Sequence, residues 1–361
     1  NFVQRGEPAC TDKFTRAEWA VMGGADLVVE IPTVFAVSSA ERFAEGAVKT
    51  LAATGVVTDL AFGVETDDVN LLYHLADLLE REPPNLKIYL MHHLKQGKSY
   101  PRAQYDALAD YGISEDELAI LQEPNNILAV EYLKALNRFA PEIRPLPIRR
   151  IGNKYNSTVL TGKLSSATAI REALLNGDES VYDAMPMSVA AAMRFDAQFP
   201  VPFDRFAPML LYRLRAMTVD ELSALPEVSE GFEQVLLRAA REAVDLPSLL
   251  DAIKSKRYTL ARCKRILVSA LLHVPAGMAD AIGRNADDMY LHVLGLKRMG
   301  RGLLSAMASR AVAPVILRHS DVQNCSDVAR ASLAIDALST DLYAYALARD
   351  LHRDSQSAIT V

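Results

Sequence analysis

Three short stretches of this sequence carry residue types that suit the binding of phosphate groups. They are Phe62-Gly-Val-Glu65, Arg149-Arg-Ile-Gly152 and Ser165-Ser-Ala-Thr-Ala-Ile-Arg171. A glycine lets a ligand approach the backbone closely, adjacent arginines offer forked donors to phosphate oxygens, and a capped helix leaves backbone N–H groups free for an anion. The stretches therefore predict an anion-binding rim, although Ser165 or Ser166 could also cap a helix that binds no ligand.

Alternating strands and helices are expected to position these stretches. Short apolar runs predict strands over residues 26–32, 59–65 and 143–151, the first of them as a buried parallel strand. Apolar positions three and four residues apart predict helices over residues 16–23, 39–54, 69–80, 85–97 and 126–139. This alternation implies a parallel sheet covered by helices, and ligands of such sheets collect at the carboxyl ends of the strands.

The second half of the chain is expected to be helical, because no convincing strand pattern follows residue 202. Amphipathic segments predict helices over residues 205–217, 218–225, 232–243, 246–254 and 259–272, with more toward the C-terminus. Thr218 and Asp245 stand where N-caps are expected. We predict two domains, an α/β domain over residues 1–200 and an all-helical domain over residues 201–361.

The composition narrows the class of protein. The 361 residues are 50% hydrophobic and 23% charged, which is typical of globular chains long enough for two domains. No apolar stretch has the length of a membrane span and no secretory signal is recognised, so a cytoplasmic protein is predicted. The three cysteines are too far apart to predict a disulfide framework or a paired-cysteine zinc site, and no metal site is predicted. No Ser-His-Asp or Cys-His arrangement is recognised either.

A basic cluster lies around the start of the helix predicted over residues 259–272. The net charge of −6 argues against indiscriminate nucleic-acid binding, but the cluster contains no acidic residue. Tyr258 lies inside it and could stack on a base. Helical spacing predicts Arg262 and Arg265 on one face with Ser269, and Leu260, Cys263, Leu267 and Leu271 on the face toward the core. The cluster is either an RNA-binding surface or a solvated helix face. Its cations are Lys254, Lys256, Arg257, Arg262, Lys264 and Arg265.

Ordered motifs over the whole chain point further. They are Asn1-Phe-Val-Gln-Arg-Gly-Glu-Pro8, Gly24-Ala-Asp-Leu-Val-Val-Glu-Ile-Pro32, Phe62-Gly-Val-Glu65, Ser99-Tyr-Pro101, Pro124-Asn-Asn-Ile-Leu128, Ser165-Ser-Ala-Thr-Ala-Ile-Arg171 and Lys256-Arg-Tyr-Thr259. In these motifs the sequence resembles the tRNA(Met) cytidine acetate ligase family, which belongs to the nucleotidyltransferase-like group of Rossmann-type enzymes. The resemblance implies an α/β Rossmann-like nucleotidyltransferase domain with a parallel sheet, followed by an all-α domain that binds tRNA.

The resemblance also implies a reaction. Acetate attacks the α-phosphate of ATP, pyrophosphate leaves, and the acetyl-adenylate acetylates the wobble cytidine of elongator tRNA(Met) to N4-acetylcytidine. ATP is then a substrate that is used with Mg²⁺. Catalysis of the first step would rest on positioning and on electrostatic stabilisation of phosphate charge, and no nucleophilic side chain is needed.

Site residues follow from the same resemblance. The ATP site is expected to contain Gly63, Asn125, Asn126, Arg149, Arg150, Ser165, Ser166 and Arg171. A charged loop beside the triphosphate or the tRNA is expected to contain Gln4, Arg5, Glu7, Lys13 and Arg16. The basic cluster with Tyr258 is expected to bind tRNA. Three alternatives stay open: a tight strand end at Gly63, a helix cap at Asn125 and a surface ion pair at Arg171.

The sequence departs from the family pattern at its start. Family members begin earlier, with a strand and a His-x-Gly-His loop that this sequence does not contain. The chain is therefore expected to lack its first strand and to have little activity alone, and its catalytic residues stay unknown. Two competing functions remain: a nucleotidyltransferase-like adenylyltransferase for a small metabolite, and a non-catalytic tRNA-binding protein.

Overall fold

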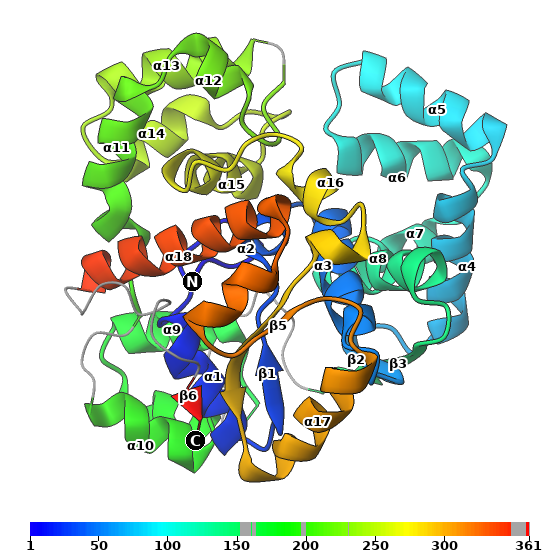
Figure 1. The fold of residues 1–361 in the computed structure, drawn as a ribbon. Helices are drawn as coiled ribbons and strands as arrows, with labels where there is room; N and C mark the ends of the chain where they lie inside the picture. The colour runs from blue at the N-terminus through cyan, green and yellow to red at the C-terminus, as the bar shows by residue number, and fades with distance from the viewer. Residues whose placement is uncertain (152–159, 161–163, 196–199, 230, 348–358, 361) are drawn as a thin grey trace.

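Two small β-sheets lie side by side in the computed structural model, which describes residues 1–151, 160, 164–195, 200–229, 231–347 and 359–360 (Figure 1). In the first sheet, β1 (Leu27–Val29) pairs antiparallel with β4 (Leu291–Leu296), and β4 pairs in parallel with β5 (Val315–Ile316) and β6 (Ile359–Thr360). In the second, β2 (Asp59–Val64) pairs in parallel with β3 (Arg144–Arg149).

The strand predictions are confirmed in position but not all in pairing. The parallel strands at residues 59–65 and 143–151 are confirmed as β2 and β3. The strand at residues 26–32 exists as β1, but its predicted parallel pairing is wrong, because its partner β4 runs antiparallel to it. The expectation that no strand follows residue 202 is also wrong. All six residues of β4 are buried, and periodicity cannot distinguish such a short apolar run from a buried helical segment.

The helices of the first half form around local signals that the sequence shows. Asp12 and Ser39 accept backbone N–H groups at the starts of the first and third helices, and Pro84 opens the helix expected over residues 85–97. The helices are α1 (Lys13–Met22), α2 (Thr33–Ala36), α3 (Ala40–Ala53), α4 (Val69–Arg81), α5 (Pro84–Lys95), α6 (Tyr100–Tyr111), α7 (Glu115–Ile120), α8 (Pro124–Phe139), α9 (Ala167–Leu175) and α10 (Met187–Phe195).

The second half is helix-rich, as expected. Thr218 and Asp245 form capping boxes at the starts of α12 and α14, which confirms both predicted caps. The helices are α11 (Ala207–Ala216), α12 (Val219–Ser223), α13 (Phe232–Glu242), α14 (Leu246–Ile253), α15 (Leu260–Leu271), α16 (Met278–Ile282), α17 (Arg301–Arg310) and α18 (Asp327–Leu347). No helix among the described residues is long and apolar enough to cross a membrane.

Packing joins the two halves of the chain. The largest hydrophobic core contains Phe2 and Phe35 from the first half together with Leu210 and Leu267 from the second. Another core forms where α4 and α8 cover one face of the β2–β3 sheet through Phe62 and other apolar side chains. Because the β1–β4 pair and the largest core both include residues on either side of position 200, the predicted domain boundary does not separate two independent cores.

Candidate functional site

The carboxyl ends of β2 and β3 bring the predicted glycine and arginine pair together. Val64 lies opposite Arg149, and the Arg150 N–H donates to Val64 O at 2.9 Å. A Cβ placed on Gly63 would lie 3.5 Å from Arg150 Cγ, which is ordinary van der Waals contact. The alternative of a tight strand end therefore does not explain Gly63, since neither its backbone conformation nor its described neighbours require a glycine.

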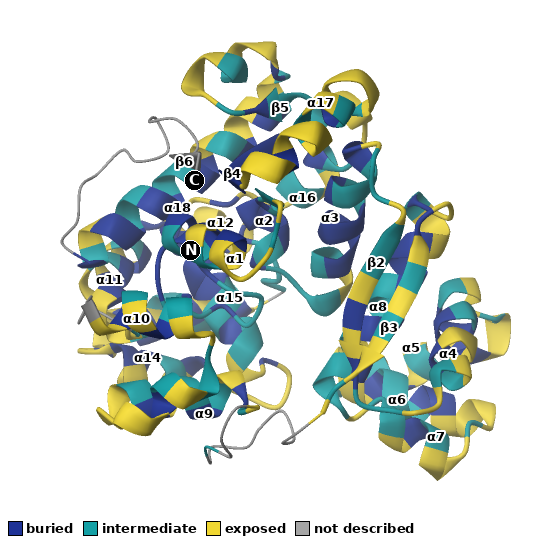
Figure 2. Cartoon of the chain, turned by 90° about the horizontal axis from the view of Figure 1, so that it is seen from below, coloured by how far each residue is buried: buried dark blue, intermediate teal, exposed yellow. Residues whose placement is uncertain are grey.

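The face of the sheet that carries Gly63 is open. Ala61 and Gly63 on β2 are exposed, as are Leu146 and Ile148 opposite them on β3, whereas Phe62 and Val64 point into the core (Figure 2). Residues two apart on a strand share a face, so the exposed positions form one continuous surface. A planar group can lie on this surface beside the strand ends.

The two asparagines brace the strand exit. Asn126 is 1% exposed, and its Oδ1 accepts the Glu65 and Thr66 N–H groups at 2.8 and 3.3 Å. Asn125 Nδ2 donates to Glu65 Oε1 at 2.8 Å. The helix cap considered for Asn125 is wrong, because Glu123 is the N-cap residue of α8. The Asn126 side chain holds the loop after β2.

Glu65 is a site residue to which the sequence analysis gave no role. Its Oε2 is buried and has no hydrogen-bond partner among the described residues, although Asn125 holds the other carboxylate oxygen. A buried acceptor without a donor is costly, so a donor at this position would stabilise the site. The signal was present in the sequence, because Glu65 is the last residue of the strand predicted over residues 59–65.

Arg149 is placed to change partners. Its guanidinium pairs with Asp67, and the two side chains are 60% and 69% exposed. Exposed ion pairs of this kind contribute about 1 kcal/mol or less, so a phosphate could replace Asp67 at little cost. Arg150 is half-buried beside Gly63 and is therefore more firmly held.

The predicted serine cap is confirmed at Ser166, whose Oγ accepts the Ala169 N–H at 3.0 Å. The helix that it caps, α9, lies on the opposite side of β1 from β2 and β3 (Figure 1). Arg171 on α9 and Arg16 on α1 both lie near Cys10. Burial raises the pKa of the Cys10 thiol, and the two positive charges act in the opposite direction. The predicted site residues therefore form two groups, and much of the segment that joins β3 to α9 lies outside the described residues.

The charged loop at residues 4–7 is fixed against α15. Gln4 Nε2 donates to Ser38 O at 2.9 Å, and Glu7 pairs with Lys264 at 2.5 Å. Gly6 has a φ of +72° and lies against the backbone of α15, where a Cβ would come within 2.3 Å of Arg265 N. Arg5 is half-buried in this loop. The loop thus connects the α/β part with the basic cluster.

Lys13 was expected beside a ligand, but the structure buries it. The side chain is 3% exposed, and Nζ lies 2.9 Å from the Glu30 carboxylate, which also lies 2.7 Å from His292 Nδ1. Burial acts to raise the pKa of Glu30, but Lys13 and His292 together hold it well below its usual range. Through Glu30, which follows β1, Lys13 on α1 is linked to His292 on β4 in the protein interior.

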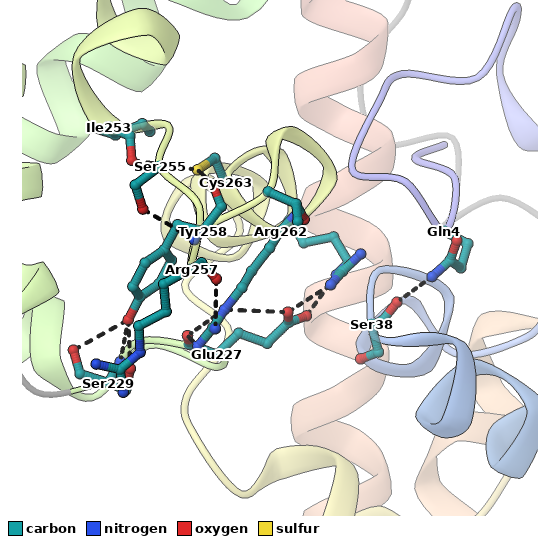
Figure 3. A network of polar contacts seen from close by, with 12 residues as sticks. Gln4, Ser38, Glu227, Ser229, Ile253, Ser255, Arg257, Tyr258, Arg262 and Cys263 are labelled. Atoms are coloured by element: carbon teal, nitrogen blue, oxygen red, sulfur yellow. Dashed lines mark hydrogen bonds and ion pairs between the residues drawn. The ribbon is translucent and has the colours of Figure 1, made fainter. Parts of the chain in front are cut away.

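Part of the basic cluster is also structural (Figure 3). Arg265 donates to both oxygens of Glu227 at 2.6 Å, and Arg262 Nε donates to Glu227 O at 3.1 Å. The absence of acids within the cluster was misleading, because Glu227 and Glu7 reach it from distant positions. We call this set of contacts from Arg262 and Arg265 to Glu227 the Glu227 clamp.

The predicted stacking role of Tyr258 is wrong. The side chain is 5% exposed and stacks on Phe232, with the two ring centroids 3.6 Å apart and an angle of 5° between the ring planes. Its hydroxyl lies 2.6 Å from Ser229 Oγ. The predicted helix faces need correction too, since Ser269 is buried and Leu260 is exposed. Three cations of the cluster stay exposed and form no ion pair with a described residue: Lys254, Lys256 and Arg257.

Comparison with known proteins gives the class and then the family. A model described as HIGH Nucleotidyl Transferase matches residues 1–358. The chain is 37% identical over 353 residues to a tRNA(Met) cytidine acetate ligase of Acetivibrio thermocellus, covering 95% of this chain and 85% of that protein. It is 34% identical over 359 residues to that of Fervidobacterium nodosum, covering 97% and 84%. The chain belongs to the tRNA(Met) cytidine acetate ligase family.

Solved structures agree with this assignment. The chain is similar to the apo crystal structure of Thermotoga maritima TmcAL, with a TM-score of 0.94, 32% identity and coverage of 100% of this chain and 90% of that one. A second structure of that protein, bound with alpha-thio ATP, gives a TM-score of 0.91. The predicted fold class, a nucleotidyltransferase domain followed by a helical domain, is confirmed, with β4, β5 and β6 as the departures from an all-α second half.

Proposed function

We propose that this protein is an ATP-dependent ligase that acetylates the wobble cytidine of elongator tRNA(Met). The observation that supports it most is the similarity of the whole chain to proteins of that name, one of which binds an ATP analogue. The open glycine and the arginines at the ends of β2 and β3 fit a nucleotide that lies across them. A cytoplasmic location follows from the tRNA substrate.

The first step needs charge stabilisation around the triphosphate. An acetate oxygen attacks Pα, the bond from Pα to the bridging oxygen breaks, and pyrophosphate leaves. Arg149 would exchange Asp67 for a phosphate oxygen. Gly63 would leave room for the adenosine.

Mg²⁺ would travel with the triphosphate and neutralise part of its charge. No group of three or more His, Cys, Asp or Glu side chains in the described part of the chain is placed to hold a metal ion by itself. A magnesium ion that is bound mainly through phosphate oxygens and water does not need such a group. In the second step the cytidine N4 attacks the acetyl carbonyl carbon, AMP leaves, and the amine proton passes to solvent.

Exchange of pyrophosphate into ATP tests the first step. We expect acetate-dependent exchange and acetylation of elongator tRNA(Met) by the protein expressed from its complete gene. Gly63→Ala should raise the KM for ATP about tenfold, as one added methyl does in a tight site, with an unchanged melting temperature. Gly302→Ala on the exposed side of α17, where a Cβ meets nothing within 4 Å, is the matched control.

Each alternative outcome points to one competing function. Exchange supported by a small metabolite but not by acetate would indicate an adenylyltransferase of another kind. Binding of tRNA without any exchange would indicate a non-catalytic tRNA-binding protein. Equal KM values for ATP in the Gly63→Ala and Gly302→Ala variants would remove Gly63 from the nucleotide site.

A further inference from the structure

A cavity of about 310 Å³ lies where the α/β part meets the helical part. Its walls come from α2 and the start of α3 on one side, and from α12, α15 and the segment that leads into α16 on the other. This volume lies at the lower end of the range for small-ligand sites, which is roughly 300 to 1,000 Å³. Ser38 and Glu227, both drawn in Figure 3, line it from opposite sides. We call it the junction cavity.

Two hydroxyl side chains line the junction cavity, those of Thr33 and Ser269. Thr33 is 5% exposed and Ser269 is 3% exposed, and neither hydroxyl makes a hydrogen bond to a described residue. The two groups, one from each half of the chain, are therefore positioned to bond to a polar ligand between them.

The charges at the junction cavity are already neutralised. Arg42 pairs with Glu45 at 2.9 Å and also with Asp280, while Glu227 is held by Arg265. Much of the remaining lining is aliphatic, including Val268 and its neighbours. Aliphatic walls with uncharged hydroxyl groups suit a flat, neutral, partly polar group such as a nucleobase, and they do not suit a phosphate or a carboxylate.

Strained backbone surrounds the same cavity. Glu227, which lines it, has a φ of 63°, and His273, between two lining residues, has a φ of 56°. Residues other than glycine rarely adopt this conformation unless the surrounding structure holds them there. The Glu227 clamp supplies that hold for Glu227. The wall of the cavity is thus kept in a defined shape before any ligand binds.

The surroundings indicate where the ligand comes from. Arg262 and Arg265 of the clamp lie on α15 beside the cavity, and the segment that leads into α15 carries the exposed cations Lys254, Lys256 and Arg257. Cations outside and a neutral pocket inside match a nucleotide whose phosphate stays at the surface while its base is unstacked and buried.

We propose that the junction cavity binds one unstacked nucleoside of the tRNA. The proposal rests on the proposed function, because it takes tRNA as the substrate. The cavity then acts as a specificity site, separate from the strand ends where the ATP is proposed to bind.

Filling the cavity tests the proposal. Ser269→Leu places an aliphatic side chain in the cavity, and Ser305→Leu on the exposed face of α17 is the matched control. We expect Ser269→Leu to weaken the binding of elongator tRNA(Met) about tenfold or more, which is the usual effect of losing one bound base. Acetate-dependent ATP–pyrophosphate exchange should not change. Ser269→Ala and Thr33→Val, which keep the cavity open, should weaken tRNA binding less.

Anticodon stem-loops with single abasic positions then identify the nucleoside. One abasic position should weaken binding to the unaltered protein and have no further effect on Ser269→Leu, because both changes remove the same contact. Unchanged tRNA affinity in Ser269→Leu, or equal losses at every abasic position in both proteins, would overturn the proposal. If Ser269→Leu also lowers the melting temperature, the pair Ser269→Ala and Thr33→Val decides, and normal tRNA affinity in both would overturn it.

The two proposals fail in different ways. If the unaltered protein does not acetylate tRNA, the proposed function is wrong. If it does, and the cavity variants bind tRNA as the control does, only the junction cavity proposal is wrong.

Discussion

The Glu227 clamp allows a stability prediction with a magnitude. The carboxylate of Glu227 accepts two hydrogen bonds of 2.6 Å from Arg265, and the side chains are 23% and 12% exposed. Removing one partner of a fully buried pair costs about 3 to 5 kcal/mol, whereas exposed pairs contribute about 1 kcal/mol or less. The clamp lies between these limits, so we expect Glu227→Gln to lower the free energy of unfolding by about 2 kcal/mol.

The backbone of Glu227 adds a second, independent test. At a φ of 63° an alanine is strained by about 1 kcal/mol, and a glycine is not. Glu227→Gly should therefore unfold at a higher urea concentration than Glu227→Ala, which is the reverse of the order expected in ordinary helices. The two variants both lack the carboxylate, so their difference isolates the backbone.

Urea unfolding followed by circular dichroism provides the measurement. The control is Asp327→Asn, which removes a surface pair with Arg330 whose side chains are 95% and 44% exposed. It should change the free energy of unfolding by about 0.5 kcal/mol or less. The reasoning is refuted if Glu227→Gln costs no more than this control, or if Glu227→Gly is the less stable of the two backbone variants.

Two further predictions concern charge. Replacing Lys254, Lys256 and Arg257 together by alanine should weaken tRNA binding and reduce the slope of log affinity against log salt by about 2. Filter binding measures both quantities, and the affinity for ATP should not change. An unaltered slope would contradict the assignment of these three cations to tRNA binding. Burial and the nearby Glu30 raise the pKa of Asp336 to about 6, so the fold holds this proton more tightly than the unfolded chain does. The stability due to Asp336 should therefore fall as pH rises from about 4 to above 6, and Asp336→Asn should remove that fall in urea unfolding. Parallel pH profiles for the two proteins would disprove it.

Local signals in the sequence were sufficient for much of the fold. Thr218 and Asp245 were recognisable as caps because a capping side chain bonds within its own first turn. The strands β2 and β3 were recognisable as short apolar runs, and their parallel pairing followed from the helices between them. Gly63 and the arginine pair came together because parallel strands end at the same edge.

Tertiary structure decided which groups pair across long distances. Residues 291–296 became a strand because β1 offered an edge, and no local pattern distinguishes such a buried run from a helix. Glu227 and Glu7 neutralise cations of a cluster that contains no acid of its own, and Phe232 covers Tyr258. Side-chain type and spacing determine where an element forms and which face is apolar. The partner of each buried charge or ring depends on which distant segments the tertiary fold brings together. The periodicity of the sequence carries no information about those long-range contacts.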